Sequence, residues 1–300
     1  MILIISDNSD RTTIEVIRYL ISMNKKFIFI QEDEVFEIKV DKKKILLISQ
    51  NNSFFIDDIK AVWYRRGGLK FKRLQYKTEP INLHMNETQY WLENYIMQTL
   101  ESKKHINKQR NSHVNKLLVL EYAQKTGFDV PPYFLAENMD NVLLNTTVTK
   151  AITGGVILDN LYKGMDGIMY TTVIEEIEEH DFFISFFQEK IDKDFEIRTF
   201  YLNGECFSMA IFSQNDEQTK TDFRKYNHKK PNRNIPYKLP RHLEDKIHEL
   251  MQTLDLNCGS IDFIKSKDRY YFLEVNPVGQ FANVAYHCNY PLFKKIADYL

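Results

Sequence analysis

The chain has 300 residues, of which 43% are hydrophobic and 27% charged. This composition is typical of a globular chain long enough for two or three sub-domains around sizeable cores. The formal net charge of −1 provides no global field, so we expect no wholesale binding to nucleic acid and no binding to a membrane surface. Three cysteines without C-x-x-C spacing, and no apolar run near ~18 residues, favour a reducing, cytoplasmic setting.

The N-terminal third alternates between strand-like and helix-like segments. Residues 2–5 form a continuous apolar run, Asp10 can cap the helix that follows, and residues 26–30 are again strand-like. This order predicts a parallel α/β unit, which strands at 45–48 and 61–64 would extend. The glycines of a G-x-G-x-x-G motif are missing, so we do not expect the nucleotide site in this part of the chain.

The middle of the chain begins with a polar, helix-prone stretch over residues 87–110. A second helix with an apolar stripe follows from residue 114 and is expected to stop at Gly127. Pro131 and Pro132 then favour extended backbone, and the β-branched residues at 142–144 and 147–152 predict strands.

The C-terminal third predicts a hairpin and a helix followed by two more strands. Asn203-Gly204 separates two apolar runs, which is the strongest short-range signal for a hairpin. Residues 243–254 have the periodicity of an amphipathic helix, and strands are expected at 260–264 and 270–275.

Three oxygen-bearing side chains in these last strands are candidate metal ligands. Glu274 and Asn276 stand two residues apart and therefore point to one side of their strand. A turn centred on Lys267 or Asp268 would bring Asp262 onto the same face, whereas a one-residue slip would send it to the other. Two carboxylates and an amide suit Mg²⁺ carrying a nucleoside triphosphate. A solvated hairpin with scattered acids would give the same pattern.

The sequence around these three residues resembles that of a known family. The string Phe272-Leu-Glu-Val-Asn-Pro277, preceded by Ile261-Asp-Phe-Ile264, closely resembles the terminal motif of ATP-grasp ligases. In that family the Asp, Glu and Asn bind the metal ions that bridge the nucleotide phosphates. The resemblance therefore implies ATP and Mg²⁺ as cofactors, held by Asp262, Glu274 and Asn276. It also implies an α/β fold with α+β lobes, namely the ATP-grasp fold.

The same resemblance implies nucleotide contacts upstream of this motif. Lys116 and Lys150 resemble the two nucleotide-contacting lysines, although lysines are by default surface residues. Gln188-Glu189-Lys190-Ile191 resembles the hinge whose main chain pairs with adenine. Glu196 and Arg198 share one face of a strand. Glu196 is expected near the nucleotide, and Arg198 near the transferred phosphate, where a guanidinium suits the developing charge; a structural ion pair would explain them too.

A narrower resemblance is to the maturases of graspetides, the microviridin-type and grasp-with-spasm cyclising ligases. It covers nearly the whole chain and rests on Trp63-Tyr-Arg-Arg66, Phe212-Ser-Gln214, Asp222-Phe-Arg224 and Asn276-Pro-Val-Gly-Gln280. It implies a precursor peptide as substrate and a homodimer. Arg224 is implied as the residue that holds the activated side-chain carboxylate, with Asp222 and Arg66 as further substrate candidates.

Together these features predict three domains and one activity. We expect an N-terminal domain at 1–110, a central lobe at 111–187 and a C-terminal lobe at 188–300. The expected enzyme activates Glu or Asp side chains of a ribosomally made peptide and forms ester or amide macrocycles. The alternatives are a glutathione-synthetase-like or glutamate-ligase-like amino-acid ligase, a kinase that stops at phosphoryl transfer to a hydroxyl, and a non-catalytic nucleotide-binding module.

Overall fold

The structure, a computed structural model, divides the chain into two compact units. It describes residues 1–153, 157–162, 165–176, 180–216, 218–225 and 227–300. Unit 1 comprises residues 1–112 together with 291–300, and unit 2 comprises residues 113–290. The predicted boundary at 187–188 lies inside unit 2, and the three-domain division stays a prediction.

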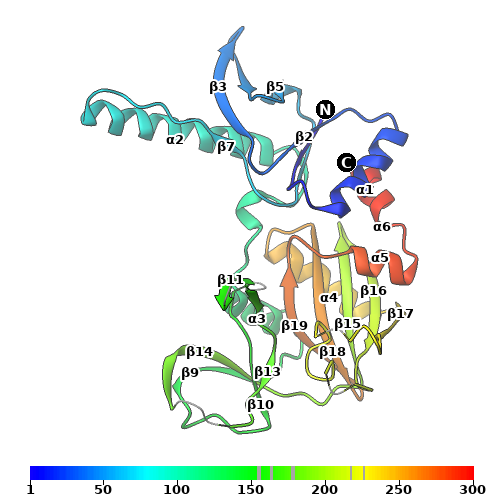
Figure 1. Cartoon of the computed structure of the whole chain (residues 1–300). Helices are drawn as coiled ribbons and strands as arrows, with labels where there is room; N and C mark the ends of the chain where they lie inside the picture. The colour runs from blue at the N-terminus through cyan, green and yellow to red at the C-terminus, as the bar shows by residue number, and fades with distance from the viewer. Residues whose placement is uncertain (154–156, 163–164, 177–179, 217, 226) are drawn as a thin grey trace. The chain divides into compact units, whose positions relative to one another are not determined.

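A parallel four-stranded sheet forms the centre of unit 1. The strand order is β2-β1-β6-β8, and all three pairings are parallel. The predicted strand, helix and strand are therefore confirmed. Asp10 caps the helix α1 by accepting a hydrogen bond from the Thr12 N–H at 2.8 Å, and α1 packs against the C-terminal helix α6 (Figure 1). The elements are β1 (Ile2–Ile5), α1 (Arg11–Ser22), β2 (Phe27–Ile30), β6 (Ala61–Tyr64), β8 (Lys104–Ile106) and α6 (Leu292–Tyr299).

A second sheet in unit 1 has the order β5-β4-β3-β7. The strand predicted at 45–48 belongs here, so its expected place in the parallel sheet was wrong. It follows β3 through a tight turn in which Lys42 and Lys43 have positive φ, and such a turn joins antiparallel neighbours. The elements are β3 (Val35–Asp41), β4 (Lys44–Ile48), β5 (Ser53–Phe55), the 3₁₀ turn η1 (Ile56–Asp58) and β7 (Lys70–Phe71).

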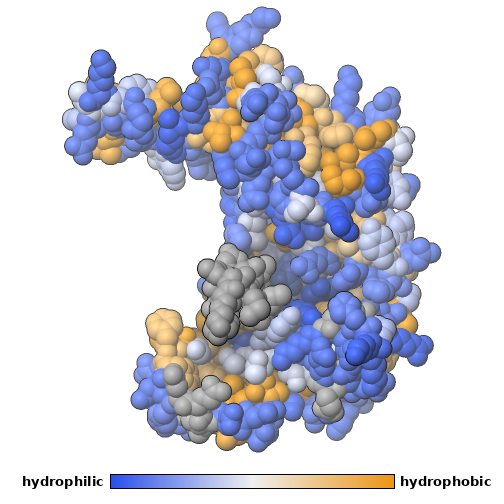
Figure 2. All heavy atoms as spheres, in the orientation of Figure 1, coloured by the Kyte–Doolittle hydropathy of each residue, from blue (hydrophilic) through white to orange (hydrophobic). Residues whose placement is uncertain are grey.

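The long helix of unit 1 begins and ends earlier than predicted. Helix α2 spans Glu79–Glu101, because Pro80 suits the first turn of a helix, and β8 follows where the sequence pattern still favoured helix. Its surface carries some apolar side chains among polar ones (Figure 2). Leu83 and Trp91 are two of the large hydrophobic side chains exposed on it. A short 3₁₀ turn, η2 (Gln109–Asn111), completes the unit. Among the described helices, none combines the length and the apolar character needed to cross a membrane.

Unit 2 begins with helix α3 and a central antiparallel sheet of order β13-β10-β14-β9. The strand predicted at 142–144 is wrong: Val142 lies in a turn, its N–H donates to the Met139 carbonyl, and its side chain is buried against Met139 and Phe187. The elements are α3 (Lys116–Lys125), β9 (Tyr133–Asn138), β10 (Thr147–Thr149), the paired strands β11 (Ile157–Tyr162) and β12 (Met165–Ile168), β13 (Thr172–Val173) and β14 (Asp181–Glu189).

A five-stranded antiparallel sheet of order β17-β16-β15-β18-β19 forms the rest of unit 2. The predicted hairpin is confirmed, and both Asn203 and Gly204 have the positive φ that its tight turn requires. The elements are β15 (Phe195–Leu202), β16 (Glu205–Phe212), β17 (Arg233–Tyr237), α4 (Arg241–Thr253), β18 (Cys258–Ser266), β19 (Arg269–Asn276) and α5 (Ala282–Cys288).

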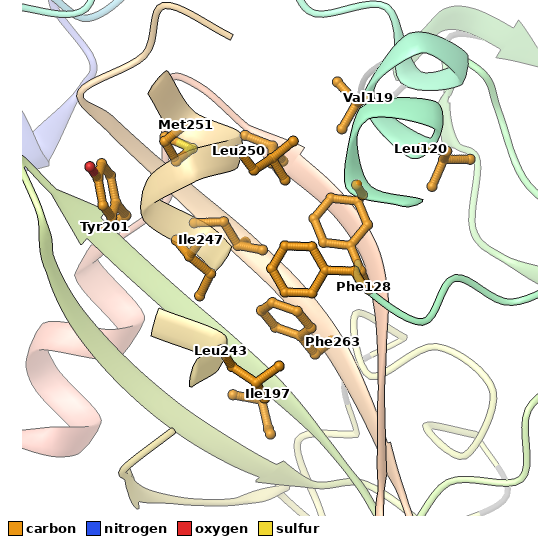
Figure 3. Close-up of a cluster of buried hydrophobic side chains, with 14 of the residues drawn as sticks. Val119, Leu120, Phe128, Ile197, Tyr201, Leu243, Ile247, Leu250, Met251 and Phe263 are labelled. Carbon is orange, nitrogen blue, oxygen red and sulfur yellow. The ribbon is translucent and has the colours of Figure 1, made fainter. Parts of the chain in front are cut away.

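The main core of unit 2 lies on one face of this five-stranded sheet. Helix α4 contributes Leu243, Ile247 and Leu250, which pack with α3 side chains and with sheet residues such as Ile197 and Phe263 (Figure 3). Alternation along each strand then assigns the residues between these core positions to the opposite face. That second face carries the polar residues singled out from the sequence.

Candidate active site

Three neighbouring strands present the candidate residues on one face of the sheet. In β15 and β18, Arg198 is directly opposite Asp262, and in β18 and β19, Asp262 is directly opposite Glu274. Asn276 is opposite Ser260 on the same face. The predicted convergence of the trio is therefore present in the structure.

A β-bulge produces this convergence. The two-residue turn pairs Ser266 with Arg269, and a regular ladder from there would place Asp262 opposite Leu273. The register shifts between Asp262 and Phe263, so that Leu273 is the extra residue of β19. Phe272 therefore stays in the core, while Glu274 turns to the same side as Asp262. The turn alone would have sent Asp262 to the wrong face.

Arg198 and Asp262 form a buried, bidentate ion pair. Arg198 Nε lies 2.8 Å from Asp262 Oδ1, and Nη2 lies 2.7 Å from Oδ2. Burial opposes the charge of Arg198, but the charge and hydrogen bonds of Asp262 raise its pKa. The guanidinium also lies 5.5 Å from the centre of the Phe223 ring. Arg198 is thus a fixed cation on the sheet face, with its fork geometry already set.

Glu274 is held by two neighbours. Lys116 Nζ lies 3.0 Å from Glu274 Oε2 and also donates to the Ala151 carbonyl at 3.0 Å. Asn276 Nδ2 donates to Glu274 Oε1 at 3.3 Å. Burial opposes ionisation of Glu274, but the charges of Lys116 and Lys150 and these hydrogen bonds hold its pKa at about 2. Lys116, the first residue of α3, therefore joins the segment after β10 to β19.

Lys150 directly follows β10 and lines a cavity of about 370 Å³. Other walls of the cavity are Ile152, Tyr170, Ser185 and Phe186. Burial and the neighbouring cations lower the pKa of Lys150 to about 8, although Glu274 and Asp262 act in the opposite direction. A lysine in this setting gains from an anionic ligand, which would restore its ordinary pKa. The glycines Gly154 and Gly155 of the loop after Lys150 lie outside the described residues.

Glu196 lies on the same face as Arg198 and is paired with Lys193. Lys193 Nζ donates to the Glu196 carboxylate, and both side chains are buried. Burial raises the pKa of Glu196 to about 7, against the lowering effect of Lys193, while Asp222 and Asp262 raise it further. The position next to Arg198 is consistent with the predicted place of Glu196 near the nucleotide, which stays a prediction.

The Asp222-Phe223-Arg224 motif lies in the loop 213–232, between β16 and β17. Asp222 accepts hydrogen bonds from the Arg224 main-chain N–H at 3.0 Å and from Arg224 Nη2 at 2.5 Å. It also accepts the Thr171 N–H at 2.9 Å. The Arg224 guanidinium lies 5.8 Å from the centre of the Tyr170 ring, which is a wall of the cavity beside Lys150. Arg224 is therefore fixed at the cavity by an acid that is itself buried.

The predicted hinge, residues 188–191, leads from β14 towards β15. Gln188 is buried, and its side chain donates to the Pro131 carbonyl at 3.4 Å. The main-chain N–H groups of Glu189 and Lys190 donate to the carbonyls of Pro132 and Thr146, both at 2.8 Å. Ile191 lies in the connection between β14 and β15. The segment connects two sheets, and its role as a hinge that contacts adenine stays a prediction.

Arg66 belongs to unit 1 and is described there. Its Nε lies 3.7 Å from Asp7 and 3.6 Å from Asp10, and its side chain is 45% exposed. Its neighbour Arg65 is buried in an ion pair with Asp10 at 2.8 Å. The role of Arg66 as a substrate contact stays a prediction.

The donor set on the sheet face fits Mg²⁺. Asp262, Glu274 and Asn276 offer only oxygen ligands, including two ionisable carboxylates, as Mg²⁺ prefers. Beside them, Ser260 Oγ is a buried hydroxyl with no hydrogen-bond partner among the described residues. Those residues contain no group of three or more His, Cys, Asp or Glu side chains with the geometry of a metal site. The trio has two acids and an amide, so it is not such a group, and its role as ligand set stays a prediction.

Three residues of the site were missed in the sequence. Lys193 is hidden among the many charged residues between β14 and β15, and only its burial marks it. Phe223 stands inside a motif that was singled out for its flanking Asp and Arg, although it stacks near Arg198. Ser260 has no distinguishing spacing; the register of β18 with β19 identifies it.

The fold is that of ATP-grasp ligases. The fold class and the ligase class were both expected from the terminal motif, and both are confirmed by comparison with solved structures. No protein-family model and no curated protein matches the sequence.

Among solved structures, the chain is similar to ATP-grasp ligases and macrocyclases that were solved in complex with peptides. A RiPP-associated ATP-grasp ligase of Chryseobacterium gregarium, solved with ADP and with a leader and core peptide, is 25% identical, with a TM-score of 0.78 over 99% of this chain and 95% of that chain. The macrocyclase MdnC of Microcystis aeruginosa, bound to its precursor peptide MdnA, is 23% identical, with a TM-score of 0.75 over 99% and 98%. The ATP-grasp ligase PsnB, with a precursor variant, Mg and ADP, is 14% identical, with a TM-score of 0.69 over 99% and 96%. The predicted resemblance to graspetide maturases is thereby confirmed.

Proposed function

We propose that this chain is an ATP-dependent ligase that activates Glu or Asp side chains of a ribosomally made precursor peptide and closes side-chain ester or amide rings. One observation carries the proposal: Arg198, Asp262 and Glu274 lie side by side on one face of the five-stranded sheet. There Arg198 pairs with Asp262, and Lys116 of α3 pairs with Glu274. Glu196, on the same face, pairs with Lys193. Solved structures of similar fold include ligases bound to ADP and to precursor peptides.

The proposed reaction has two steps. A carboxylate oxygen of the peptide attacks the terminal phosphorus of ATP, which releases ADP and leaves an acyl phosphate. A hydroxyl or amine of the same peptide then attacks the acyl carbon, loses its proton, and expels inorganic phosphate. The first step is needed because a carboxylate resists such attack, whereas phosphate is a good leaving group. The net change is the loss of one water from the peptide.

Different residues of the chain would bind the nucleotide, the metal ion and the substrate. Lys116 and Lys150 would hold the phosphates, and the hinge at 188–191 the adenine. Arg198 would stabilise the charge on the transferred phosphoryl group, since its guanidinium is already oriented. Asp262, Glu274 and Asn276 would hold Mg²⁺, which neutralises phosphate charge when bound. Arg224 would hold the carboxylate that is activated, with Asp222 as the acid that positions it; Arg66 and Glu196 are further candidates for substrate and nucleotide contacts.

A homodimer working in the cytoplasm is part of the same proposal. The apolar side chains exposed along α2, including Ile81 and Trp91, support an interface on unit 1. Sedimentation of the purified chain measures its oligomeric state.

Mass spectrometry tests the function. The purified chain is incubated with MgATP and a candidate precursor peptide, chosen from any short reading frame found beside its own gene. Loss of one water per ring supports ligation, and fragmentation then identifies an ester or an amide. A gain of phosphate on the peptide that survives treatment with hydroxylamine indicates a kinase. Addition of a free amino acid to the peptide indicates an amino-acid ligase. An unchanged peptide, with ADP bound to the chain, indicates a nucleotide-binding module.

A further inference from the structure

Lys193 is a buried lysine that the proposed reaction leaves without a role. Its side chain is 7% exposed, and lysines are rarely buried unless they are paired. Its Nζ donates to the Glu196 carboxylate, on β15, and to the main-chain carbonyl of Thr221 at 2.9 Å. Thr221 belongs to the loop 213–232. Lys193 therefore joins two elements that are separate in sequence.

The residue that Lys193 holds directly precedes the motif that fixes Arg224. From Thr221 the chain continues into Asp222, whose carboxylate binds both Arg224 and the Thr171 N–H. Lys225 N–H closes the turn by donating to the Asp222 carbonyl at 3.1 Å. The turn is thus attached at two places, to Thr171 on the cavity side and to Lys193 on the β15 side.

The β15 side of this attachment also carries Arg198. Glu196 and Arg198 are two residues apart on β15 and share the face opposite the core. Phe223, inside the turn, lies against the Arg198 guanidinium at 5.5 Å. The Lys193 contacts therefore keep the turn that carries Arg224 next to the strand that carries Arg198.

We propose that Lys193 is a positioning residue, which ties the Asp222–Arg224 turn to β15 so that Arg224 is held ready for a substrate carboxylate beside Arg198. The inference rests on the proposed function for the role of Arg224. The contacts of Lys193 with Glu196 and Thr221, called the tether below, are a property of the free protein, so they are tested without a substrate.

The alternative is that Lys193 only neutralises the buried Glu196. Both roles predict that Lys193→Met lowers the melting temperature, because an unpaired carboxylate is left in a buried place. Adding Glu196→Gln to Lys193→Met removes that charge. We expect the double variant to regain most of the melting temperature, and the tether predicts that it still has a loosened turn.

Hydrogen exchange of the full chain without ligand measures the turn directly. We expect the N–H groups of Arg224, Lys225 and Thr171 to exchange at least about tenfold faster in Lys193→Met and in the double variant, with β15 and β18 unchanged. Lys229→Met, which changes an exposed lysine of the same loop, is the matched control and should leave these rates unaltered. Unchanged exchange of the turn in the double variant overturns the tether.

Steady-state kinetics with the precursor peptide link the tether to Arg224. We expect Lys193→Met to raise the KM for the peptide about tenfold and to leave the KM for ATP near its wild-type value. In an Arg224→Ala background the same change should add almost nothing, because the residue that it positions is gone. Full additivity, or a rise in the KM for ATP alone, contradicts the proposal. Failure of every variant and of the wild type to modify the peptide counts against the proposed function, while the exchange result still decides the tether.

Discussion

Two Arg–Asp pairs among the described residues have both side chains buried, and their surroundings differ. In unit 1, Arg65 Nε lies 2.8 Å from Asp10, and both side chains are at most 5% exposed. Asp10 also caps α1 and accepts from the Thr12 N–H and hydroxyl. In unit 2, Arg198 binds Asp262 with similar distances and burial. The geometry of the pair alone therefore does not distinguish scaffold from site.

The neighbours of each acid make the distinction. Asp10 is satisfied by a helix N-terminus, by Thr12 and by arginine, and burial is outweighed by these contacts, which lower its pKa. Asp262 instead stands directly opposite a second carboxylate, Glu274, at a sheet face where Lys116 and Lys150 also gather. Two acids are placed together where folding alone would keep them apart. Such an arrangement indicates a site built for a cation and an anionic ligand.

Removal of a predicted metal ligand should give the largest effect. We expect Glu274→Gln and Asn276→Ala each to lower kcat about a thousandfold. Glu274→Gln removes the charge of a predicted Mg²⁺ ligand with little change in side-chain volume, and Asn276→Ala removes the oxygen of another. Peptide turnover by mass spectrometry and the melting temperature are measured together. Arg269→Gln, in an exposed pair of the same strand, is the control that should keep both values. Normal turnover of both variants would show that the metal assignment is wrong.

Matched substitutions can show whether each of the two Arg–Asp pairs serves stability alone or also catalysis. Arg65→Met and Arg198→Met each leave a buried carboxylate unpaired, and each should cost about 3 kcal/mol in the free energy of unfolding. We expect Arg198→Met also to lower kcat about a hundredfold, because it removes a cation from the transferred phosphoryl group. Denaturant unfolding and kcat per folded molecule are the measurements. Equal losses of kcat in the two variants would remove the distinction between scaffold and site.

The sequence predicted the strand pairs of unit 2 better than the register that makes the site. The Asn203-Gly204 turn and the alternation of β15 were sufficient to predict the first hairpin and the common face of Glu196 and Arg198. For the second hairpin, regular alternation puts Phe272 and Glu274 on one face, yet the bulge at Leu273 separates them. No local pattern marks this bulge, because it is the packing of Phe272 with Phe128 and Phe263 that fixes Phe272 in the core.

A local turn and a long-range contact account for the other differences between prediction and structure. The strand at 45–48 was predicted correctly, but its partner is chosen by the turn at Lys42 and Lys43 and not by its own apolar residues. Lys193 could not be singled out among the charged residues around it, since its partner Thr221 lies 28 residues away. Family resemblance supplied Arg224 and Asp222, and the structure adds the contacts that hold them.

The smallest of the expected effects concerns Lys150, and its pH dependence gives it a distinct signature. Burial lowers the pKa of Lys150 to about 8 in the free protein, and a bound phosphate raises it again. Binding therefore takes up a proton above pH 8, so the affinity for MgADP should fall by about tenfold in all as the pH rises from roughly 8 to 10. Calorimetry in buffers of different ionisation enthalpy measures both the affinity and the proton uptake.

Two variants decide whether Lys150 is the group that titrates. Lys150→Met should weaken MgADP binding about tenfold at pH 7 and remove the dependence, because the protonated group is gone. Lys150→Arg keeps its charge at every pH of the experiment, so its affinity should be flat as well, but closer to that of the wild type. Glu196, whose pKa of about 7 lies nearby, is tested by Glu196→Gln. Persistence of the wild-type slope in Lys150→Met would place the titrating group elsewhere and would leave the cavity beside β10 without a role in phosphate binding.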